Sequence, residues 1–213
     1  MNPAEHLAEL FLRFPGIGPK QAKRFVYFLL RENIHYKQDL IHTIEELKHS
    51  GKQCEQCFRF FGDKFKSDIS LCEICRNENR DKNIIMIVEK ELDIDAIEKA
   101  GTYNGLYFVL GGVIPPLVDK PSEYIRIKEL VVYLHLKIQD LPAQTGKNLS
   151  EIIFALPVTD NGDTTKEYLL KTISQIVGIK DIKISSLARG LSSGLELEYV
   201  DRATFKSAFE RRE

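Results

Sequence analysis

The sequence lacks a strong excess of charge of either sign. Its 30 Lys and Arg residues nearly balance its 31 Asp and Glu residues, which gives a formal net charge of -1 and a sequence pI of about 6.5. A protein that coats nucleic acid without specificity is usually more basic than this. Any binding to nucleic acid must therefore come from a local patch.

Long hydrophobic runs are also missing. No apolar stretch approaches the roughly 18 residues that a membrane span requires, so we expect no association with a membrane. The first residues, MNPAEHLAELFL, have no basic region, and Glu5 and Glu9 interrupt their apolar character. We therefore do not expect a signal peptide, and we expect a cytoplasmic protein.

Cysteine is scarce, and all four cysteines lie between positions 54 and 75. A disulfide framework would spread its cysteines along a secreted chain. The pairs CEQC and CEIC instead place two thiols on each of two tight turns, fourteen residues apart. One such pair would suit a redox site, but two pairs favour a tetrahedral metal, and zinc fits best. The predicted structural site is Cys54, Cys57, Cys72 and Cys75, with His49 as a weaker alternative ligand.

Three amphipathic helices are indicated by apolar spacing in residues 1–50, which we interpret as a small helical domain. Pro3 suits the first turn of the first helix. The three apolar stripes are Leu7, Leu10, Phe11 and Phe14; Ala22, Phe25, Val26, Leu29 and Leu30; and Leu40, Ile44 and Leu47.

A glycine-rich turn, FPGIGPK, separates the first two helices. Gly16 and Gly18 can adopt unusual backbone angles and leave room for a close neighbour. The turn should direct free amides and a helix N-terminus outward, which suits a phosphate. Residues 1–31 carry five Lys or Arg against two Glu, a local net charge of +3. This helix–hairpin–helix pattern predicts binding to the DNA backbone through Gly16, Gly18, Lys20, Lys23 and Arg24. A purely structural or assembly role is the alternative.

From residue 84 onward, apolar segments rich in β-branched residues alternate with helical patterns. We predict strands over 84–88, 106–112, 151–159 and 182–188, with helices over 93–101, 122–138 and 164–177. Ser122 is the expected cap of the second of these helices, and 141–150 is expected to be a loop. Such alternation predicts a parallel α/β sheet.

Acidic residues follow two of the predicted strands. Glu89 and Asp93 follow the first strand, and Asp163 follows the third. Carboxylates at neighbouring strand ends can bind magnesium. Capping of the following helices is the alternative for Asp93 and Asp163, and we favour it over a magnesium site.

The order of these parts resembles the RecR family of bacterial recombination-repair proteins. The resemblance covers nearly the whole chain. It is carried by FPGIGPKQAKRFVYFLL, the two CxxC pairs, RDKNIIMIVEKELDIDAIEKAGTYNGLYFVLGGVIPPL, ALPVTDNGDTTKEYL and LARGLSSGLELEYVDRATFKSAFERR. It implies a helix–hairpin–helix domain (1–50), a four-cysteine zinc finger (51–80), a Toprim domain (81–190) and a C-terminal assembly segment (191–213).

The resemblance also implies a function and partners. RecR-like proteins are non-enzymatic DNA-binding mediators that assemble as rings. They work with RecO, and sometimes RecF, to load RecA on gapped DNA. Because a local charge of +3 offers few phosphate contacts, we expect this chain to form a dimer or a tetrameric ring. Glu89 would be the Toprim glutamate. Asn161 replaces an acid of the family pattern, and Phe108 stands where the family often has histidine. A metal-dependent Toprim nuclease is the alternative function.

Overall fold

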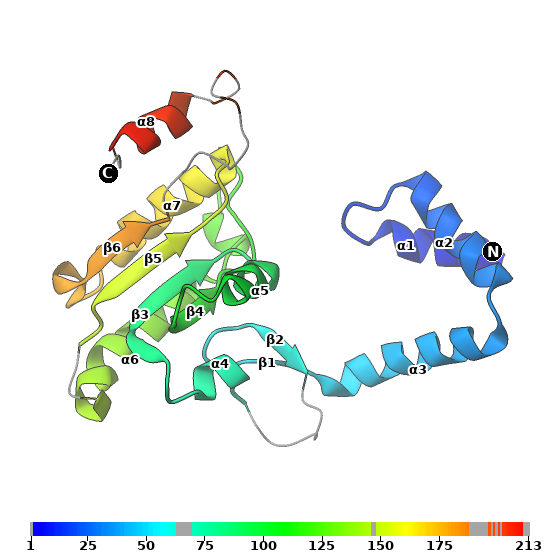
Figure 1. Cartoon of the computed structure of the whole chain (residues 1–213), viewed down its shortest axis with the longest axis horizontal. Helices are drawn as coiled ribbons and strands as arrows, with labels where there is room; N and C mark the ends of the chain where they lie inside the picture. Colours follow the sequence, from blue (N-terminus) through cyan, green and yellow to red (C-terminus); the bar gives the residue numbers. More distant parts are fainter. Residues whose placement is uncertain are drawn as a thin grey trace. The chain divides into compact units, whose positions relative to one another are not determined.

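The computed structural model describes residues 2–62, 70–145, 148–187, 196, 198, 200 and 202–210. The chain divides into two compact units. One unit comprises residues 1–51 with 62–66, and the other comprises residues 52–61 with 67–213. Figure 1 shows the helical first unit and the α/β second unit.

The first unit contains the three predicted helices, α1 (Pro3–Leu12), α2 (Pro19–Arg31) and α3 (Ile34–Ser50). Asn2 caps α1, and Asn33 caps α3 by accepting the Tyr36 amide at 2.8 Å. The Phe11 ring of α1 packs edge-on against Phe25 of α2, with 5.5 Å between centroids. The prediction that Phe14 continues the first helix was wrong, because α1 ends at Leu12.

This unit buries few apolar side chains. Among its described residues, Ala22 and Val26 are the apolar side chains that fall in the buried class. Large apolar residues on all three helices remain exposed: Leu10, Leu12, Tyr27, Phe28, Leu30, Ile34, Tyr36, Ile41, Ile44 and Leu47. The unit therefore presents much of its apolar surface to solvent.

The second unit is built on a parallel sheet, as predicted. Its strands are β3 (Asp81–Val88), β4 (Gly105–Val109), β5 (Glu151–Ala155) and β6 (Lys183–Ser186), in the order β4-β3-β5-β6. All three strand pairs are parallel. The helices are α5 (Glu91–Ala100), α6 (Ile127–Thr145), α7 (Asp160–Ile173) and α8 (Arg202–Glu210), with single 3-10 turns at Pro121–Glu123 and Ile179–Asp181.

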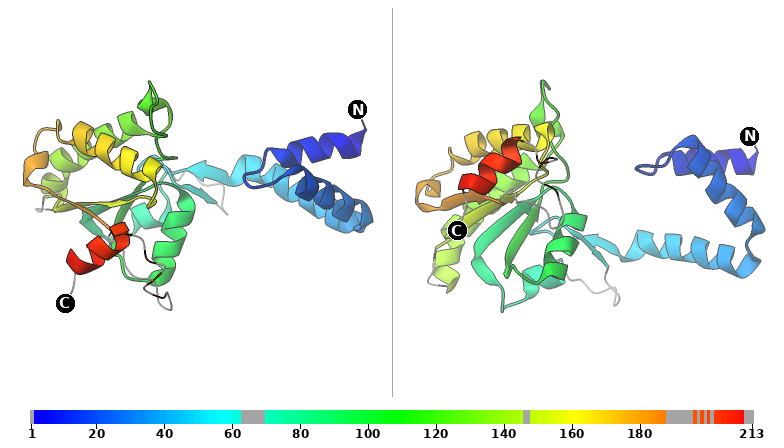
Figure 2. Two further views of the ribbon diagram at one scale, coloured as in Figure 1. Left: turned by 90° about the horizontal axis from the view of Figure 1, so that it is seen from above. Right: turned by 45° about the horizontal axis from the view of Figure 1, so that its top comes forward.

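Alternate residues of β3 face two different cores. Ile85 and Ile87 pack with residues of α6 and α7 on one side of the sheet. Met86 and Val88 pack with Ile94 of α5 and with the four cysteines on the other side. The two further views in Figure 2 show these helices on opposite faces of the sheet.

Helix boundaries around α6 and α7 differ from the prediction. The helix predicted to start at Ser122 begins at Ile127, because Pro121–Glu123 form a separate 3-10 turn and the Arg126 amide donates to the Leu110 carbonyl. The same helix runs on to Thr145, so 141–145 is helical rather than a loop. The residues DNGD form the first turn of α7, because the Thr159 hydroxyl caps that helix by accepting the Gly162 amide.

The four cysteines lie in a small finger attached to this sheet. Its elements are β1 (Gly51–Gln53), β2 (Phe60–Gly62) and the one-turn helix α4 (Glu73–Arg76). Arg59 joins the finger to α5, because its guanidinium bonds both Glu73 at 2.7 Å and Asp95 at 3.1 Å. The finger is therefore held to the sheet unit by ion pairs as well as by its apolar contacts.

A second polar cluster fixes α5 on β3 and β4. The Glu98 carboxylate is bound by the Arg80 guanidinium, and it accepts the Tyr107 hydroxyl at 2.6 Å. The hydrogen bonds from Arg80, and then that from Tyr107, lower the pKa of Glu98 below its ordinary value of 4.5, although partial burial opposes the shift. The cluster therefore favours the ionised carboxylate in the folded state.

We expect Glu98→Gln to lower the free energy of unfolding at pH 7 by about 2 kcal/mol, because hydrogen bonds to a charged group are lost. A carboxylate with a lowered folded-state pKa stabilises the fold above its unfolded pKa. The difference between wild type and variant should therefore shrink as the pH falls below 4.5 and through the lower folded-state value. Denaturant titrations at several pH values measure it. Glu123→Gln, at an exposed pair with Lys120, is the control and should change stability by less than about 0.5 kcal/mol.

Candidate functional site

The strongest candidate site is the cysteine cluster of the finger. The Sγ atoms of Cys54, Cys57, Cys72 and Cys75 all lie within 4.8 Å of one another, and all four residues are buried. Within the described ranges, this is the one group of three or more such side chains close enough to share a metal ion. The structure thus gathers the four residues that the CxxC spacing predicted. The side chain of His49, the weaker alternative, lies outside the described residues.

Local hydrogen bonds shape both turns that carry the thiols. In the first turn, the Phe58 amide donates to the Cys54 carbonyl, and the Cys54 amide donates to the Arg59 carbonyl, both at 2.9 Å. In the second, Cys72 precedes α4 and Cys75 lies within it. The Cys72 amide also donates to the Cys54 sulfur at 3.4 Å, which joins the two turns.

The sulfur geometry fits a tetrahedral metal. Four sulfurs at about 2.3 Å from one ion lie roughly 3.8 Å from one another, and the Cys57 and Cys72 sulfurs are 3.6 Å apart. In the free thiol set, hydrogen bonds from Cys57 and the other two cysteines strongly lower the pKa of Cys54. The bond to Cys54 correspondingly raises the pKa of Cys57. The four thiols therefore strongly influence one another, and it is the spacing of their sulfurs that fits a metal cation.

The predicted hairpin lies between α1 and α2. Gly16 has a φ of +76°, a conformation that favours glycine. Gly18 is the N-cap of α2, and Pro19 occupies the first helical position. A Cβ atom added to either glycine would have no neighbour within 4 Å. The space beside both glycines is therefore open to an external group.

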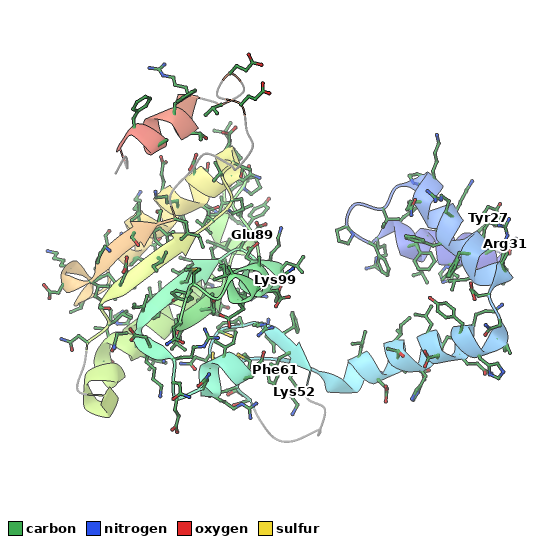
Figure 3. The ribbon with its side chains drawn as sticks, in the orientation of Figure 1. Tyr27, Arg31, Lys52, Phe61, Glu89 and Lys99 are labelled. Carbon is green, nitrogen blue, oxygen red and sulfur yellow. The ribbon has the colours of Figure 1, made fainter. Side chains whose placement is uncertain are left out.

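The predicted basic residues share one exposed face of α2. Lys20, Lys23 and Arg24 are all exposed, and Arg24 donates to the Gln21 side chain at 3.2 Å. Tyr27 and Arg31 continue this face toward the end of the helix, as Figure 3 shows. The hairpin and the basic side chains thus form a single outward surface in the first unit.

The predicted acids occupy the carboxyl edge of the sheet but not one cluster. Glu89 follows β3 and lies 3.8 Å from the Lys90 ammonium. Asp93 caps α5 by accepting the Lys90 amide at 3.0 Å, and Asp163 is exposed in the first turn of α7. These three acids do not form a ligand group among the described residues.

Asn161 and its neighbours have a packing role that the sequence did not reveal. The Asn161 carbonyl accepts the buried Thr165 hydroxyl at 2.6 Å, and Thr165 accepts the Ile114 amide at 2.8 Å. A Cβ atom on Gly162 would lie 1.9 Å from the Pro157 carbonyl oxygen, so glycine is required there. These contacts fix the first turn of α7 against the segment that follows β4.

Phe58 and Arg126, which lie near the end of β4, are further residues that sequence reasoning missed. Phe58 has a φ of +63°. Nothing in the sequence indicates this left-handed backbone, because residues other than glycine rarely adopt it. Its ring lies 5.4 Å from that of buried Phe108, the residue that departs from the family pattern. The Arg126 guanidinium lies over the Phe58 ring at 5.7 Å.

The tyrosines near the sheet are packed rather than poised for chemistry. Tyr107 is fully buried and bonds Glu98, and Tyr103 donates to the Leu106 carbonyl at 2.8 Å. Burial raises the pKa of both hydroxyls, which disfavours a phenolate nucleophile.

Over the described stretches, no helix is both long and apolar enough to cross a membrane.

Comparison with known proteins matches this architecture. Residues 83–188, which include most of the parallel sheet, match the family of the Toprim domain. A recombination protein RecR from Amoebophilus asiaticus is 37% identical over 93% of this chain and 89% of its own length. Those of Chloroherpeton thalassium and Bdellovibrio bacteriovorus are 36% and 35% identical, over 99% and 100% of this chain and 96% and 97% of theirs. Such identity extends through the helical unit, the cysteine cluster and the sheet together, and the chain therefore belongs to the RecR family of recombination proteins.

Proposed function

We propose that this protein is a non-enzymatic DNA-binding mediator of recombinational repair. It acts in the cytoplasm with RecO, and with RecF where that protein is present, to help load RecA on gapped DNA. The observation that carries this proposal is the exposed hairpin surface, where open glycines and a helix N-terminus adjoin Lys20, Lys23 and Arg24. Such a surface suits phosphates and reads no bases, so binding is independent of sequence.

The metal of the cysteine cluster is proposed to be a single structural Zn²⁺ per chain. Four thiolates are a donor set that zinc prefers, and they leave no position open for a substrate. The finger is too small to supply a core of its own, and metal binding is therefore coupled to its folding. Magnesium is not required for the proposed function.

We propose four functional regions along the chain. Residues 1–50 bind DNA and contribute to assembly, 51–80 form the zinc finger, 81–190 form the Toprim domain, and 191–213 form an assembly segment. Of the last region, the structure describes residues 196, 198, 200 and 202–210. Its helix α8 carries two stacked aromatic rings, Phe205 and Phe209, and Phe209 is exposed.

Self-association is proposed to raise the affinity for DNA. One hairpin with a local net charge of +3 offers few phosphate contacts, and repeating it in a dimer or tetrameric ring supplies avidity. The exposed apolar side chains of the first unit are the proposed joint. A hollow of about 480 Å³ in the same unit, lined by Phe11, Phe25, Phe28 and Leu40 among others, gives a partner copy a place to pack.

Introducing a charge into this joint tests the proposal. Ile44 is 57% exposed on α3. We expect Ile44→Glu to shift the mass in light scattering toward the monomer and to weaken DNA binding about 10-fold or more, through lost avidity. Thr43→Glu adds the same charge at the next exposed position of α3 and should change neither. A wild-type monomer at tens of micromolar that still binds DNA tightly would refute the assembly mechanism.

A metal-dependent Toprim nuclease is the second candidate function. It is favoured by the position of Glu89 at the end of β3, beside the strand order reversal between β3 and β5 where ligands bind in such sheets. Single-turnover cleavage assays with Mg²⁺ and Mn²⁺ separate the two functions. Nicking that follows the protein peak and disappears in Glu89→Gln would establish the nuclease, and we expect none.

A further inference from the structure

The first cysteine turn covers the open edge of the sheet. β4 is the outer strand beside β3, and all five of its residues are buried. An outer strand exposes unpaired amides and carbonyls unless another segment covers them. The Val109 amide, at the end of β4, donates to the Cys57 carbonyl at 2.9 Å. A predicted metal ligand thus contributes its own backbone to the edge of the sheet.

Phe58, the next residue, is held in a strained conformation that its contacts stabilise. A left-handed conformation, such as the φ of +63° at Phe58, is unfavourable for a residue other than glycine. The ring offsets this cost, since it packs on Phe108 and beneath the Arg126 guanidinium. The turn is therefore anchored through a side chain as well as through the Cys57 carbonyl.

Arg126 extends the anchor along the segment that follows β4. Its guanidinium donates to the Val109 carbonyl at 3.1 Å, and its amide donates to the Leu110 carbonyl at 2.9 Å. Gly111 has a φ of +87°, and a Cβ atom there would lie 2.5 Å from the Arg126 Nη1 atom. The cysteine turn and Arg126 therefore contact the segment 109–111 from one side.

The same segment holds the acidic end of β3 on its other side. The Leu110 amide donates to the Val88 carbonyl and the Gly111 amide to the Glu89 carbonyl, both at 2.9 Å. We infer that the metal centre fixes the position of Glu89 through residues 109–111, with Phe58 and Arg126 as positioning residues. Removing the metal frees residues 109–111 and the backbone of Glu89, while β5 and β6 stay folded.

This inference rests on the proposed metal and not on the DNA-binding surface. Without the ion, nothing links the two cysteine turns covalently, and the Cys54–Phe58 turn can leave the edge of β4. The amides of residues 109–111 then exchange with solvent. Strand β5 lies on the far side of β3 and keeps its pairing with β6.

Hydrogen exchange on the full chain tests the inference, before and after a chelator removes the metal. We expect removal to accelerate exchange roughly 10-fold more in peptides covering 106–112 than in peptides of β5, whose acceleration reports the general loss of stability. Unchanged exchange at 106–112 would overturn the inference. Equal acceleration in β5 would also overturn it, because it would show general unfolding.

Two variants that leave the ligands intact make the test specific. Phe58→Ala and Arg126→Met should retain one metal per chain by elemental analysis and still accelerate exchange at 109–111 several-fold. Phe60→Ala, at an exposed position of the same finger, and Lys128→Met, two residues beyond Arg126, are the matched controls and should show no effect. Metal-loaded variants that exchange like their controls would refute this inference alone. A wild-type chain that contains no metal would refute the metal centre and this inference together.

Discussion

Replacing Cys72 by serine is expected to remove the bound metal and to destabilise the sheet unit by about 4 kcal/mol or more, the range typical of a lost metal site. For a chain of 213 residues this lowers the midpoint of thermal unfolding by roughly 8 to 16 °C. The effect is large because the four thiols lie in the core cluster that includes Met86 and Val88 of β3. Loss of the ion should therefore destabilise the sheet as well as the finger.

Elemental analysis and calorimetry of freshly purified protein measure this effect. Wild type should contain one equivalent of zinc per chain, and Cys72→Ser should contain much less. Ser70→Ala changes a neighbouring residue of the same finger and should leave both the metal content and the melting midpoint unchanged. Less than half an equivalent in wild type, or a Cys72→Ser variant that melts like wild type, would contradict the zinc site.

Removing Lys23 and Arg24 together is expected to weaken binding to every DNA sequence alike, by about 10- to 100-fold at physiological salt. Each phosphate contact adds roughly 0.9 to the slope of the logarithm of affinity against the logarithm of salt concentration. The Lys23→Ala/Arg24→Ala variant should therefore flatten that slope by about 1 to 2. Both side chains are exposed on the hairpin face, where they can reach phosphates.

Fluorescence titrations over a range of salt concentrations measure the slope. The matched control, Lys37→Ala/Lys48→Ala, removes the same charge from α3 of the same unit. It should leave the slope close to that of wild type. If the hairpin variant binds like wild type across salt, then the hairpin face is not the DNA site.

The local patterns in the sequence were sufficient for most elements and for the metal ligands. The three N-terminal helices follow apolar spacing, and the four strands follow short apolar runs between helical patterns. The CxxC pairs predicted the cysteine cluster, because each pair fixes two thiols on one turn and only the meeting of two turns was left to folding. The helix boundaries at Ser122 and Asp160 were missed, since contacts distant in sequence determine the first and a hydroxyl cap determines the second.

The acidic residues show where sequence patterns stop being sufficient. Glu89, Asp93 and Asp163 were expected at one edge of the sheet, and all three lie at that edge. What keeps these carboxylates apart is the local partner that each one has. Asp93 bonds the Lys90 amide and Glu89 faces the Lys90 ammonium, so a shared metal site does not follow from a shared edge.

The sequence by itself determined the family, the order of the parts and the residues able to bind a metal, because periodicity and short spacings act within a few residues along the chain. Only the tertiary structure showed that Cys57, Phe58 and Arg126 meet at the end of β4, although they lie up to 69 positions apart in the sequence. The reason is that an outer strand must pair its amides with some segment, and the sequence does not state which segment reaches it. Folding brings the cysteine turn to Val109, and the residues that follow Val109 bond the backbone of Val88 and Glu89.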